Sequence, residues 1–584
     1  MCSSDLARSR SEADWIVGMN STRAATIRLR SSFDGAVSLG RVQTPTLAIV
    51  ARREEEIRAF KPEPYWLVDA DFSASGERLY EGRFHAGAKP RLATAEEAEA
   101  IVAAVREAGR GTITKLEKTK RKERAPLLYD LTSLQRDANN RFGFSARRTL
   151  AAAQRLYEEH KALTYPRTSS RFLTSDMVPE IKPTAEQVGR DDRDYAAAAA
   201  YVTGLDLLPL GRVVNDEKVA DHHAIIPTNS PHTVDRMQPD DRRIYDLVAR
   251  RFLAAFHPEA EFENTRVETT VAEHVFRTRG KVLVVPGWRG VYGQMADADR
   301  GADEEDEGRD QQLPRLEQGE EAEVRRVESL EKETQPPRRY SDASLLAAME
   351  TAGKLVDDDE LREAMKDSGI GTPATRAAII ERLIDVGYIE RDGRALVATE
   401  KGLNVIRLLG EHPLTSPGLT GDWEKRLADI EHGRDSRERF MSDIAGFAEN
   451  TVQELDAKLK DVRIPRANLG ECPICGRDIV ENRKGYSCWS REDPGCGFVI
   501  WKSKAGKNLG PSIARELIHR GFTEKPVTGF KGRSGRAFRA KLALQQSEDG
   551  KWRVEFDEPW AHEGAKPPEE APAEQGAEQP AEAA

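Results

Sequence analysis

Residues 131–173 read LTSLQRDANNRFGFSARRTLAAAQRLYEEHKALTYPRTSSRFL. The pattern predicts a helix that ends at Gly143 and a second helix that begins at a capping serine, Ser145. A few extended residues then lead to Tyr165, Pro166 and Arg167. Proline fixes its own φ and pushes the preceding residue toward extended backbone, so we expect Tyr165 to be held at a turn beyond the second helix.

Tyr165 has either a structural or a chemical role. A phenol has a pKa near 10 and attacks phosphorus poorly at neutral pH unless nearby cations offset the developing charge. Arg167, two residues further on, is permanently charged and can hold a phosphate through two hydrogen bonds. Because most buried tyrosines are structural, this motif alone leaves both roles open.

Other segments carry features that suit the binding of anions. VADHHAIIPT (219–228) has His222 and His223 before an apolar run. SLGRVQTPTL (38–47) and SGIGTPATRAAIIERLIDVGYIERDGRALVATEKG (368–402) place glycine turns at helix starts, where free N–H groups and the helix dipole favour an anion. The longer segment continues into a helix and a hairpin-like pair of strands, as in a winged-helix reader of DNA. No GxxxxGK[ST] pattern occurs, which argues against an ATP-driven motor.

Together, these segments resemble the type IA DNA topoisomerases, most nearly bacterial topoisomerase III. The resemblance includes RSEADWIVGMNSTRA (10–24) and LTGDWEKRLADIEHG (419–433), and it covers nearly all of residues 7–460 in the family's order. It implies a multidomain, mainly α fold with a β-rich hinge domain, forming a fragment of the family's toroid. A C-terminal zinc-ribbon-like α+β module is implied as well.

The expected domains follow from this resemblance and from the order of the predicted elements. They are a helical, winged-helix-like DNA-binding domain (1–53 and 336–461), a β-rich hinge (54–124 and 241–335), a helical domain with the catalytic tyrosine (125–240), a zinc-ribbon-like module (464–504), a topoisomerase C-terminal repeat (505–560) and a disordered tail (561–584).

The resemblance implies a role for each matching residue. Tyr165 falls on the catalytic tyrosine that joins a 5′ DNA phosphate, Arg167 on the arginine that positions the scissile phosphate, and His222 on the active-site histidine. His222 either exchanges a proton or positions another group by a hydrogen bond, and both roles stay open. The implied DNA-binding residues are Arg10, Asp14, Arg23, Ser38, Leu39, Gly40, Arg41, Val42, Gln43 and Thr375.

The implied reaction is a transient single-strand break that exchanges a phosphodiester for a phosphotyrosine ester of similar energy, so the break reseals without ATP. Passage of a strand through the break changes DNA topology. Two features depart from the family. Ser169 stands where the family usually has an aspartate after YPRT. The sequence also lacks a recognisable Toprim segment with the acids that hold Mg²⁺, so we expect that this N-terminal domain is missing and that the chain alone is inactive.

Four of the five cysteines, Cys472, Cys475, Cys488 and Cys496, lie close together. Four thiolates can close a tetrahedral Zn²⁺ site, and the first pair has zinc-knuckle spacing whereas the second pair is C-x7-C. The sequence predicts a structural zinc, with a module that folds without metal as the alternative. Three aromatic residues, Trp489, Phe498 and Trp501, either stack on unpaired bases or fill a small core.

The chain has 584 residues and a net charge of −10, most of which lies in residues 297–310 and in the tail. Residues 502–541 are basic, as expected of a surface that meets a phosphate backbone. The absence of a long apolar run and of a signal segment predicts a cytoplasmic, nucleoid-associated protein without a membrane span. We expect a monomer that binds single-stranded DNA and a helicase or single-strand-binding protein. The alternative is a non-catalytic single-stranded DNA-binding protein.

Overall fold

The computed structural model describes residues 3–559 apart from short gaps. The gaps are 31, 34, 75–78, 88, 220, 294–309, 356–368, 461, 463–467, 483, 489–495, 533–536 and 548–549. Residues 297–309 of the predicted acidic stretch, Trp489 and the predicted tail therefore lie outside the described residues. The chain divides into two compact units, Met1–Glu12 with Gly40–Met441 and Ala13–Leu39 with Ser442–Ala584.

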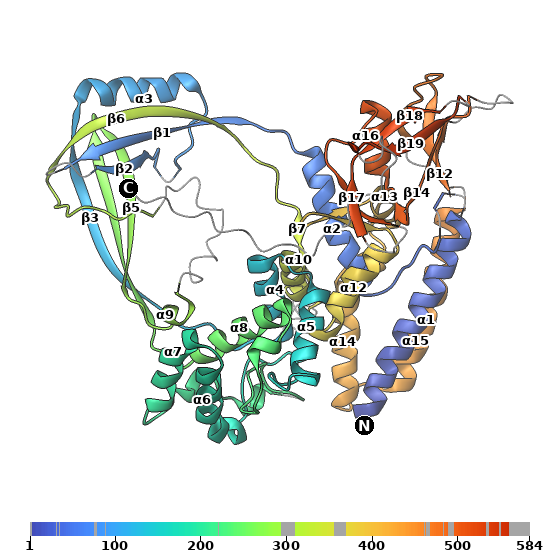
Figure 1. Cartoon of the computed structure of the whole chain (residues 1–584), viewed down its shortest axis with the longest axis horizontal. Coiled ribbons are helices and arrows are strands. Elements are labelled where there is room, and N and C mark those ends of the chain that lie inside the picture. Colours follow the sequence, from blue (N-terminus) through green and yellow to red (C-terminus); the bar gives the residue numbers. More distant parts are fainter. Residues whose placement is uncertain are drawn as a thin grey trace. The chain divides into compact units, whose positions relative to one another are not determined.

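The first unit contains a closed barrel of six antiparallel strands. They are β1 (Pro64–Ser73), β2 (Leu79–Phe84), β3 (Arg110–Glu123), β4 (Ala260–Val271), β5 (His274–Val285) and β6 (Glu321–Glu333), in the order β1-β2-β5-β4-β3-β6. Two strand-rich segments that are far apart in sequence thus share one sheet. Phe72 and Phe276 pack edge-on in its core, with ring centroids 5.4 Å apart. Helix α3 (Ala95–Ala108) lies across β1 and β6 (Figure 1).

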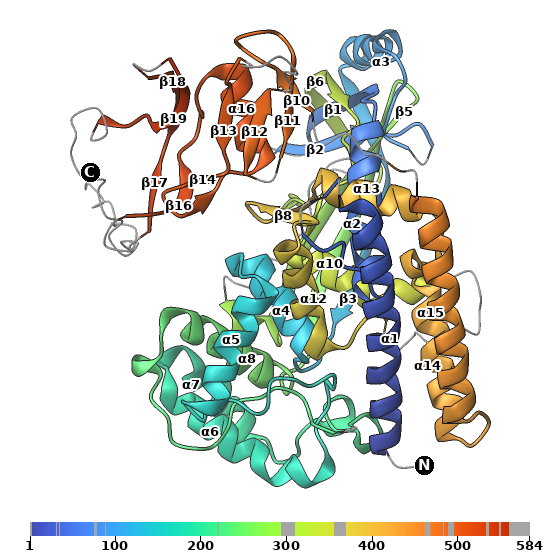
Figure 2. The ribbon, with the colours of Figure 1, turned by 90° about the vertical axis from the view of Figure 1, so that its right-hand side faces the viewer.

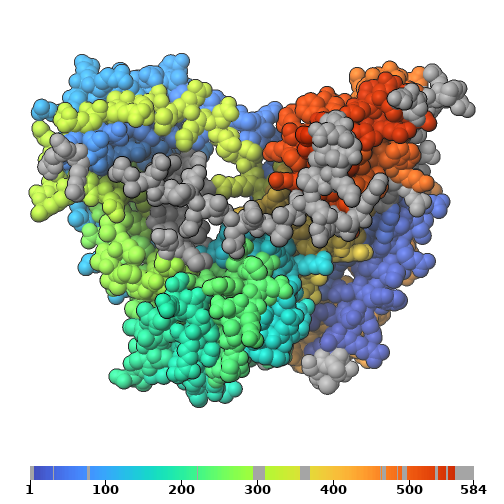
Figure 3. Space-filling model, viewed as in Figure 1, coloured from blue at the N-terminus to red at the C-terminus, as the bar shows by residue number. Residues whose placement is uncertain are grey.

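The helices inserted between β3 and β4 share one hydrophobic core. The surface of this region is drawn in teal and green in Figure 3. The helices are α4 (Leu131–Phe142), α5 (Ala146–Glu158), α6 (Ile181–Asp191), α7 (Arg193–Gly204) and α8 (Pro239–Ala254). A short helix, α9 (Arg289–Tyr292), adds to this core. Helix α4 ends at left-handed Gly143, with φ of 68°, and the Ser145 hydroxyl accepts the Arg148 N–H of α5 at 3.2 Å. Both helix ends agree with the sequence prediction.

The predicted boundary at residue 241 is wrong, because it cuts through α8. The apolar residues of α8 recur at helical spacing, and Ile244, Leu247, Val248 and Phe252 are all buried in the helical core. The β-rich segment begins only at Ala260, where β4 starts.

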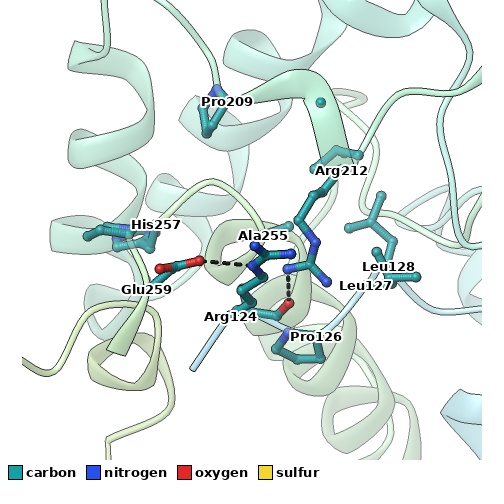
Figure 4. A pocket seen from close by; sticks show the side chains of 13 residues that line it. Arg124, Pro126, Leu127, Leu128, Pro209, Arg212, Ala255, His257 and Glu259 are labelled. Carbon is teal, nitrogen blue, oxygen red and sulfur yellow. Dashed lines mark hydrogen bonds and ion pairs between the residues drawn. The ribbon is translucent and has the colours of Figure 1, made fainter. Parts of the chain in front are cut away.

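Short crossings connect the barrel to the helical core at residues 124–128, 255–259 and 286–288. Arg124 Nε lies 3.0 Å from Glu259 Oε1, which ties the first crossing to the second. Arg212 Nη1 donates to the Ala125 carbonyl oxygen at 2.8 Å. A cavity of about 320 Å³ lies between the crossings and the loop around Arg212 (Figure 4). A cavity therefore remains where the barrel joins the helical core.

A winged-helix arrangement completes the first unit. It comprises α2 (Gln43–Ala59), β7 (Tyr340–Ser341), α10 (Asp342–Glu350), α12 (Pro373–Asp385), β8 (Ile389–Asp392), β9 (Ala395–Ala398), α13 (Glu400–Leu409) and α14 (Gly418–Glu431), with sheet order β7-β9-β8. The turn into α12 requires Gly369, because φ there is 61° and a Cβ would lie 2.3 Å from the Met349 carbonyl oxygen. The predicted helix and hairpin are thus both present.

In the second unit, the part of α1 (Ser3–Leu29) that follows Ala13 lies beside α15 (Arg437–Leu459), as Figure 2 shows. An ion pair between Arg28 and Asp456 joins the two helices, with 2.5 Å between nitrogen and oxygen. Of the helices that the structure describes, none is both long enough and apolar enough to span a membrane.

The C-terminal residues of this unit form a single small domain. Its elements are β10 (Asn468–Glu471), β11 (Asp478–Glu481), β12 (Gly485–Cys488), β13 (Val499–Trp501), β14 (Ser503–Lys504), β15 (Lys507–Asn508), α16 (Pro511–Arg520), β16 (Val527–Lys531), β17 (Ala537–Ala540), β18 (Leu542–Gln546) and β19 (Trp552–Phe556). The predicted division between 504 and 505 is wrong, since Tyr486 and Ile500 share one core with Leu517 and Phe530.

A buried histidine makes the stability of the helical core depend on pH. His232 Nε2 lies 3.0 Å from Asp191 Oδ2 and 3.0 Å from the Tyr245 hydroxyl, and the His232 side chain is 1% exposed. Burial alone would lower the pKa of His232, but the hydrogen bond and charge of Asp191 outweigh burial and raise it. Because the pKa of His232 is higher in the folded than in the unfolded state, protonated His232 stabilises the fold. This stabilisation is fully present below about pH 6.5, the unfolded pKa, and is lost as the pH rises through the folded pKa.

We therefore expect the free energy of unfolding to fall as the pH rises above about 6.5, and the variant His232→Gln to remove this component of the slope. Urea denaturation at a series of pH values measures both. His257→Gln is the matched control, because burial lowers the pKa of His257 and its stabilising contribution has the opposite pH dependence. Equal slopes for the unaltered protein and His232→Gln would contradict the assignment.

Candidate active site

A tight turn after α5 brings Tyr165 back alongside the helix that precedes it. Lys161 adopts a left-handed conformation with φ of 55°, which is uncommon for a residue with a side chain. The Ala162 N–H then donates to the Leu156 carbonyl oxygen at 2.8 Å, so the chain reverses. Tyr165 consequently lies close to the last turn of α5, although eight positions separate it from Tyr157.

Hydrogen bonds join the segment around Tyr165 to the segment around His222. The Thr164 N–H donates to the Ile226 carbonyl oxygen at 3.0 Å, and its hydroxyl donates to the Ala224 carbonyl oxygen at 3.2 Å. The Thr168 hydroxyl donates to the carbonyl oxygen of His222 at 2.7 Å. Threonines on both sides of Tyr165 therefore fix its position relative to His222.

Tyr165 and His222 are in direct contact. Their ring centroids lie 4.4 Å apart at an interplanar angle of 48°. Tyr165 is half-buried, whereas His222 is exposed. The contact is between rings, and the described structure has no hydrogen bond from the Tyr165 hydroxyl to His222. This geometry fits His222 as a group that positions the tyrosine, and proton exchange would require the side chains to rearrange.

Arg167 and the neighbouring predicted residues differ in exposure. Arg167 is exposed, and its Nη2 donates to Gln154 Oε1 at 3.3 Å. Ser169, at the position where an aspartate is usual, is also exposed. His223 Nδ1 lies 2.8 Å from the carbonyl oxygen of Ala224, so His223 interacts with its own backbone segment. Arg167 is thus the predicted cation beside Tyr165 that remains open to a substrate.

Arg10 and Arg41 come together on a residue that the sequence analysis did not single out. Glu424 of α14 binds Arg10 Nη2 at 2.6 Å and Arg41 Nη1 at 3.2 Å. The Arg41 side chain is 4% exposed, and its guanidinium lies 4.8 Å from the ring centroid of Trp423. Glu424 and Trp423 both belong to the segment LTGDWEKR, so the motif was visible in sequence but its partners were not.

The other predicted DNA-binding residues occupy varied settings. Thr375 is exposed and accepts the Thr372 N–H at 3.0 Å, as part of a capping box at the start of α12. In the second unit, Arg23 is exposed, Asp14 is half-buried, and Ser38 and Leu39 are buried, with the Leu39 N–H donating to the Thr22 hydroxyl at 2.9 Å. Gly40, Val42 and Gln43 are half-buried. Contact of these residues with DNA stays a prediction.

The four cysteines of the C-terminal domain form a compact cluster. Their sulfur atoms all lie within 4.8 Å of one another, with 3.6 Å between Cys472 and Cys496 and 3.3 Å between Cys475 and Cys488. Four thiolates at about 2.3 Å from a tetrahedral zinc would be separated by about 3.8 Å, so the cluster fits this ion. The wide C-x7-C spacing causes no difficulty, because paired β12 and β13 bring Cys488 and Cys496 together.

Local hydrogen bonding prepares one of these thiols for a metal. The backbone N–H of Arg477 and the neighbouring Cys488 thiol lower the pKa of Cys475 to about 7, whereas burial raises the pKa of Cys472. Among the described residues this is the one cluster of three or more acidic, histidine or cysteine side chains that could hold a metal.

The aromatic residues near the cluster divide between core and surface. Phe498 is 2% exposed and belongs to the core of the C-terminal domain, so of its two predicted roles it has the one of filling the core. Trp501 is 57% exposed. Of the lysines beside it, Lys502 pairs with Glu481 at 2.7 Å.

Comparison with known proteins identifies the family. A family model described as DNA topoisomerase matches residues 2–442. The chain belongs to the bacterial type IA DNA topoisomerase family. A second model, the C-terminal repeat of topoisomerase, matches residues 495–557, and so begins before the predicted limit at 505.

Two curated relatives of this topoisomerase are the proteins named DNA topoisomerase 3 in Bacillus subtilis and Bacillus licheniformis. Each is 38% identical over 89% of this chain and 70% of its own length. A solved structure of full-length topoisomerase I from Thermotoga maritima has the same fold, with a TM-score of 0.61 and 21% identity over 94% of this chain and 78% of that chain. The chain is thus an enzyme of the topoisomerase class, as the sequence predicted.

We expect the cysteine cluster to bind about one zinc ion per chain after anaerobic purification. Cys475→Ser removes one thiolate and is expected to reduce the zinc content well below that ratio and to lower the melting temperature of the C-terminal domain. Elemental analysis and thermal denaturation of the full chain measure the two effects. Cys2→Ser is the matched control, because Cys2 is the one cysteine of the sequence that is not a predicted zinc ligand. A zinc ratio near zero in the unaltered protein would contradict a structural zinc.

Proposed function

We propose that this chain carries the cleavage residues of a topoisomerase III-like enzyme, which cuts one strand of single-stranded DNA through a 5′-phosphotyrosine at Tyr165. The observation that carries the proposal is the contact between the half-buried Tyr165 ring and His222, with exposed Arg167 two residues away. The threonine hydrogen bonds on either side of Tyr165 support a preset position for this tyrosine. The relatives named DNA topoisomerase 3 support the same activity.

The chemistry is an exchange of two ester bonds. The phenol oxygen of Tyr165 loses its proton to solvent and forms a bond to phosphorus. The bond from phosphorus to the 3′ oxygen breaks, and this oxygen takes up a proton from solvent, so the released DNA end carries a 3′ hydroxyl. Arg167 offsets the negative charge on the phosphate through its two-pronged guanidinium. His222 holds the tyrosine ring. The reverse attack by the 3′ hydroxyl reseals the strand without ATP, because the two esters are of similar energy.

Strand passage requires the broken ends to separate, and we place this movement between the helical core and the winged-helix region. Arg171 bridges them, with 3.0 Å to Asp130 and 3.2 Å to Glu350. The Ala146 N–H donates to Asp342 Oδ1 at 3.1 Å. The Arg171–Glu350 pair is about one third exposed and can be exchanged for water, whereas the Ala146–Asp342 bond is buried and must break when the regions separate. The crossings between the barrel and the helical core keep these two regions attached to each other.

The remaining functional assignments are parts of the same proposal. Arg10, Asp14, Arg23, Ser38 to Gln43 and Thr375 contact DNA, and zinc holds the C-terminal domain together. The family resemblance implies Mg²⁺ held by Toprim carboxylates, and the proposed mechanism assigns no step to it. We also propose that the protein is a monomer and that it acts on DNA together with a helicase or a single-strand-binding protein. Its proposed location is the nucleoid in the cytoplasm.

Tyr165→Phe removes the attacking oxygen, so we expect this variant to form no covalent adduct. The complete gene product is incubated with Mg²⁺ and a single-stranded oligonucleotide labelled at its 3′ end, because the enzyme stays on the 5′ phosphate of the labelled fragment. An SDS-resistant labelled protein band measures the adduct. Arg167→Lys keeps the charge but loses the two-pronged grip, and we expect about 10²-fold less adduct.

Tyr201→Phe is the matched control for this experiment. Tyr201 is an exposed tyrosine of α7, 42% exposed, and it loses the same hydroxyl without touching the site. An adduct formed by Tyr165→Phe would refute Tyr165 as the nucleophile. Binding of the oligonucleotide without any adduct in the unaltered protein would instead support a non-catalytic single-stranded DNA-binding protein.

A further inference from the structure

Two side chains of α5 that lie outside the hydrophobic core contact Tyr165 and Arg167, the two residues proposed for DNA cleavage. Gln154 and Tyr157 are three residues apart and therefore lie on the same side of the helix. The residues that α5 buries in the helical core are a separate set: Ala146, Thr149, Ala152, Ala153 and Leu156. The packing of α5 thus leaves the side chains of Gln154 and Tyr157 free for another role.

Tyr157 packs against the proposed nucleophile and contributes nothing to the core. Its ring meets the Tyr165 ring edge-on, with centroids 5.5 Å apart and an interplanar angle of 80°. Tyr157 is 37% exposed, and its one other described contact is the Lys161 ammonium, 5.9 Å from the ring centroid. With His222 also in contact, Tyr165 has an aromatic ring from each of two separate segments against it.

Gln154 holds the predicted phosphate-binding arginine. Its amide oxygen accepts from Arg167 Nη2 at 3.3 Å, and its amide nitrogen donates to Glu158 Oε1 at 2.9 Å. The bond to Glu158 fixes which end of the amide faces Arg167. A neutral acceptor orients the guanidinium without cancelling its charge, which therefore remains available to a phosphate.

We propose that Tyr157 and Gln154 are positioning residues for DNA cleavage, with Tyr157 fixing the Tyr165 ring and Gln154 fixing the Arg167 guanidinium. The inference rests on the proposed function, because it assigns roles relative to a phosphotyrosine reaction. Neither side chain takes part in bond exchange. Each restricts a reacting group to one orientation before DNA binds. Less conformational entropy is then lost in reaching the transition state of cleavage.

Tyr157→Leu removes the ring, and we expect it to slow adduct formation by about 10- to 100-fold while the affinity for the oligonucleotide stays within about twofold. Tyr157→Phe keeps the ring and is expected to restore the rate to within about twofold of the unaltered protein. Gln154→Ala is expected to slow the reaction similarly. Single-turnover cleavage of the 3′-labelled oligonucleotide by the complete gene product gives the rate, and filter binding gives the affinity.

Tyr201→Leu is the control for loss of an exposed tyrosine from the helical core, and it should retain the full rate. A normal rate in Tyr157→Leu, or a Tyr157→Phe as slow as Tyr157→Leu, would overturn the role of Tyr157. A loss confined to affinity would also overturn it and make Tyr157 a platform for a nucleobase. An unaltered protein without any adduct would refute the proposed function and this inference together, whereas normal variants refute only the inference.

Discussion

The hydrogen bond from the Thr168 hydroxyl to the carbonyl oxygen of His222 is the constraint on which the candidate site depends. It joins segments that lie 54 positions apart in the chain, and the hydroxyl of Thr164 repeats the arrangement on the other side of Tyr165. Hydroxyl-to-backbone bonds of this kind fix the backbone and leave the intervening side chains free. Tyr165 and Arg167 are therefore carried on a hydrogen-bonded backbone segment, with Tyr165 half-buried and Arg167 exposed.

The same division between a fixed frame and accessible side chains recurs elsewhere. Glu424 holds Arg10 and Arg41 on α14, and Arg41 is buried against Trp423. Breaking a buried charge pair leaves an uncompensated charge, so such contacts define one arrangement of the elements that carry them. The contacts between the helical core and the winged-helix region are of two kinds. The Arg171 and Glu350 side chains are 33% and 30% exposed, whereas Asp342 is 4% exposed where it accepts the Ala146 N–H.

Local patterns in the sequence predicted the helix ends and the winged-helix hairpin, because glycine and serine act on the residues next to them. Gly143, Ser145 and Gly369 each occupy the conformation or cap that their residue type favours. The predicted domain limits were less accurate. Residue 241 lies within α8, and the cysteine module shares its core with the C-terminal repeat. Domain limits depend on which apolar surfaces meet, and alternation or spacing along the chain does not contain that information.

The sequence by itself determined the residue types of the candidate site and its family, since Tyr165, Arg167, His222 and the four cysteines lie in recognisable motifs. Only the tertiary structure decided their contacts. It placed the ring of His222 on Tyr165, buried Arg41 and Phe498, and brought Tyr157 and Gln154 against the reacting pair. The physical reason is the left-handed turn at Lys161 followed by the pairing of residues 162–168 with 222–228, which creates neighbours that are distant in sequence.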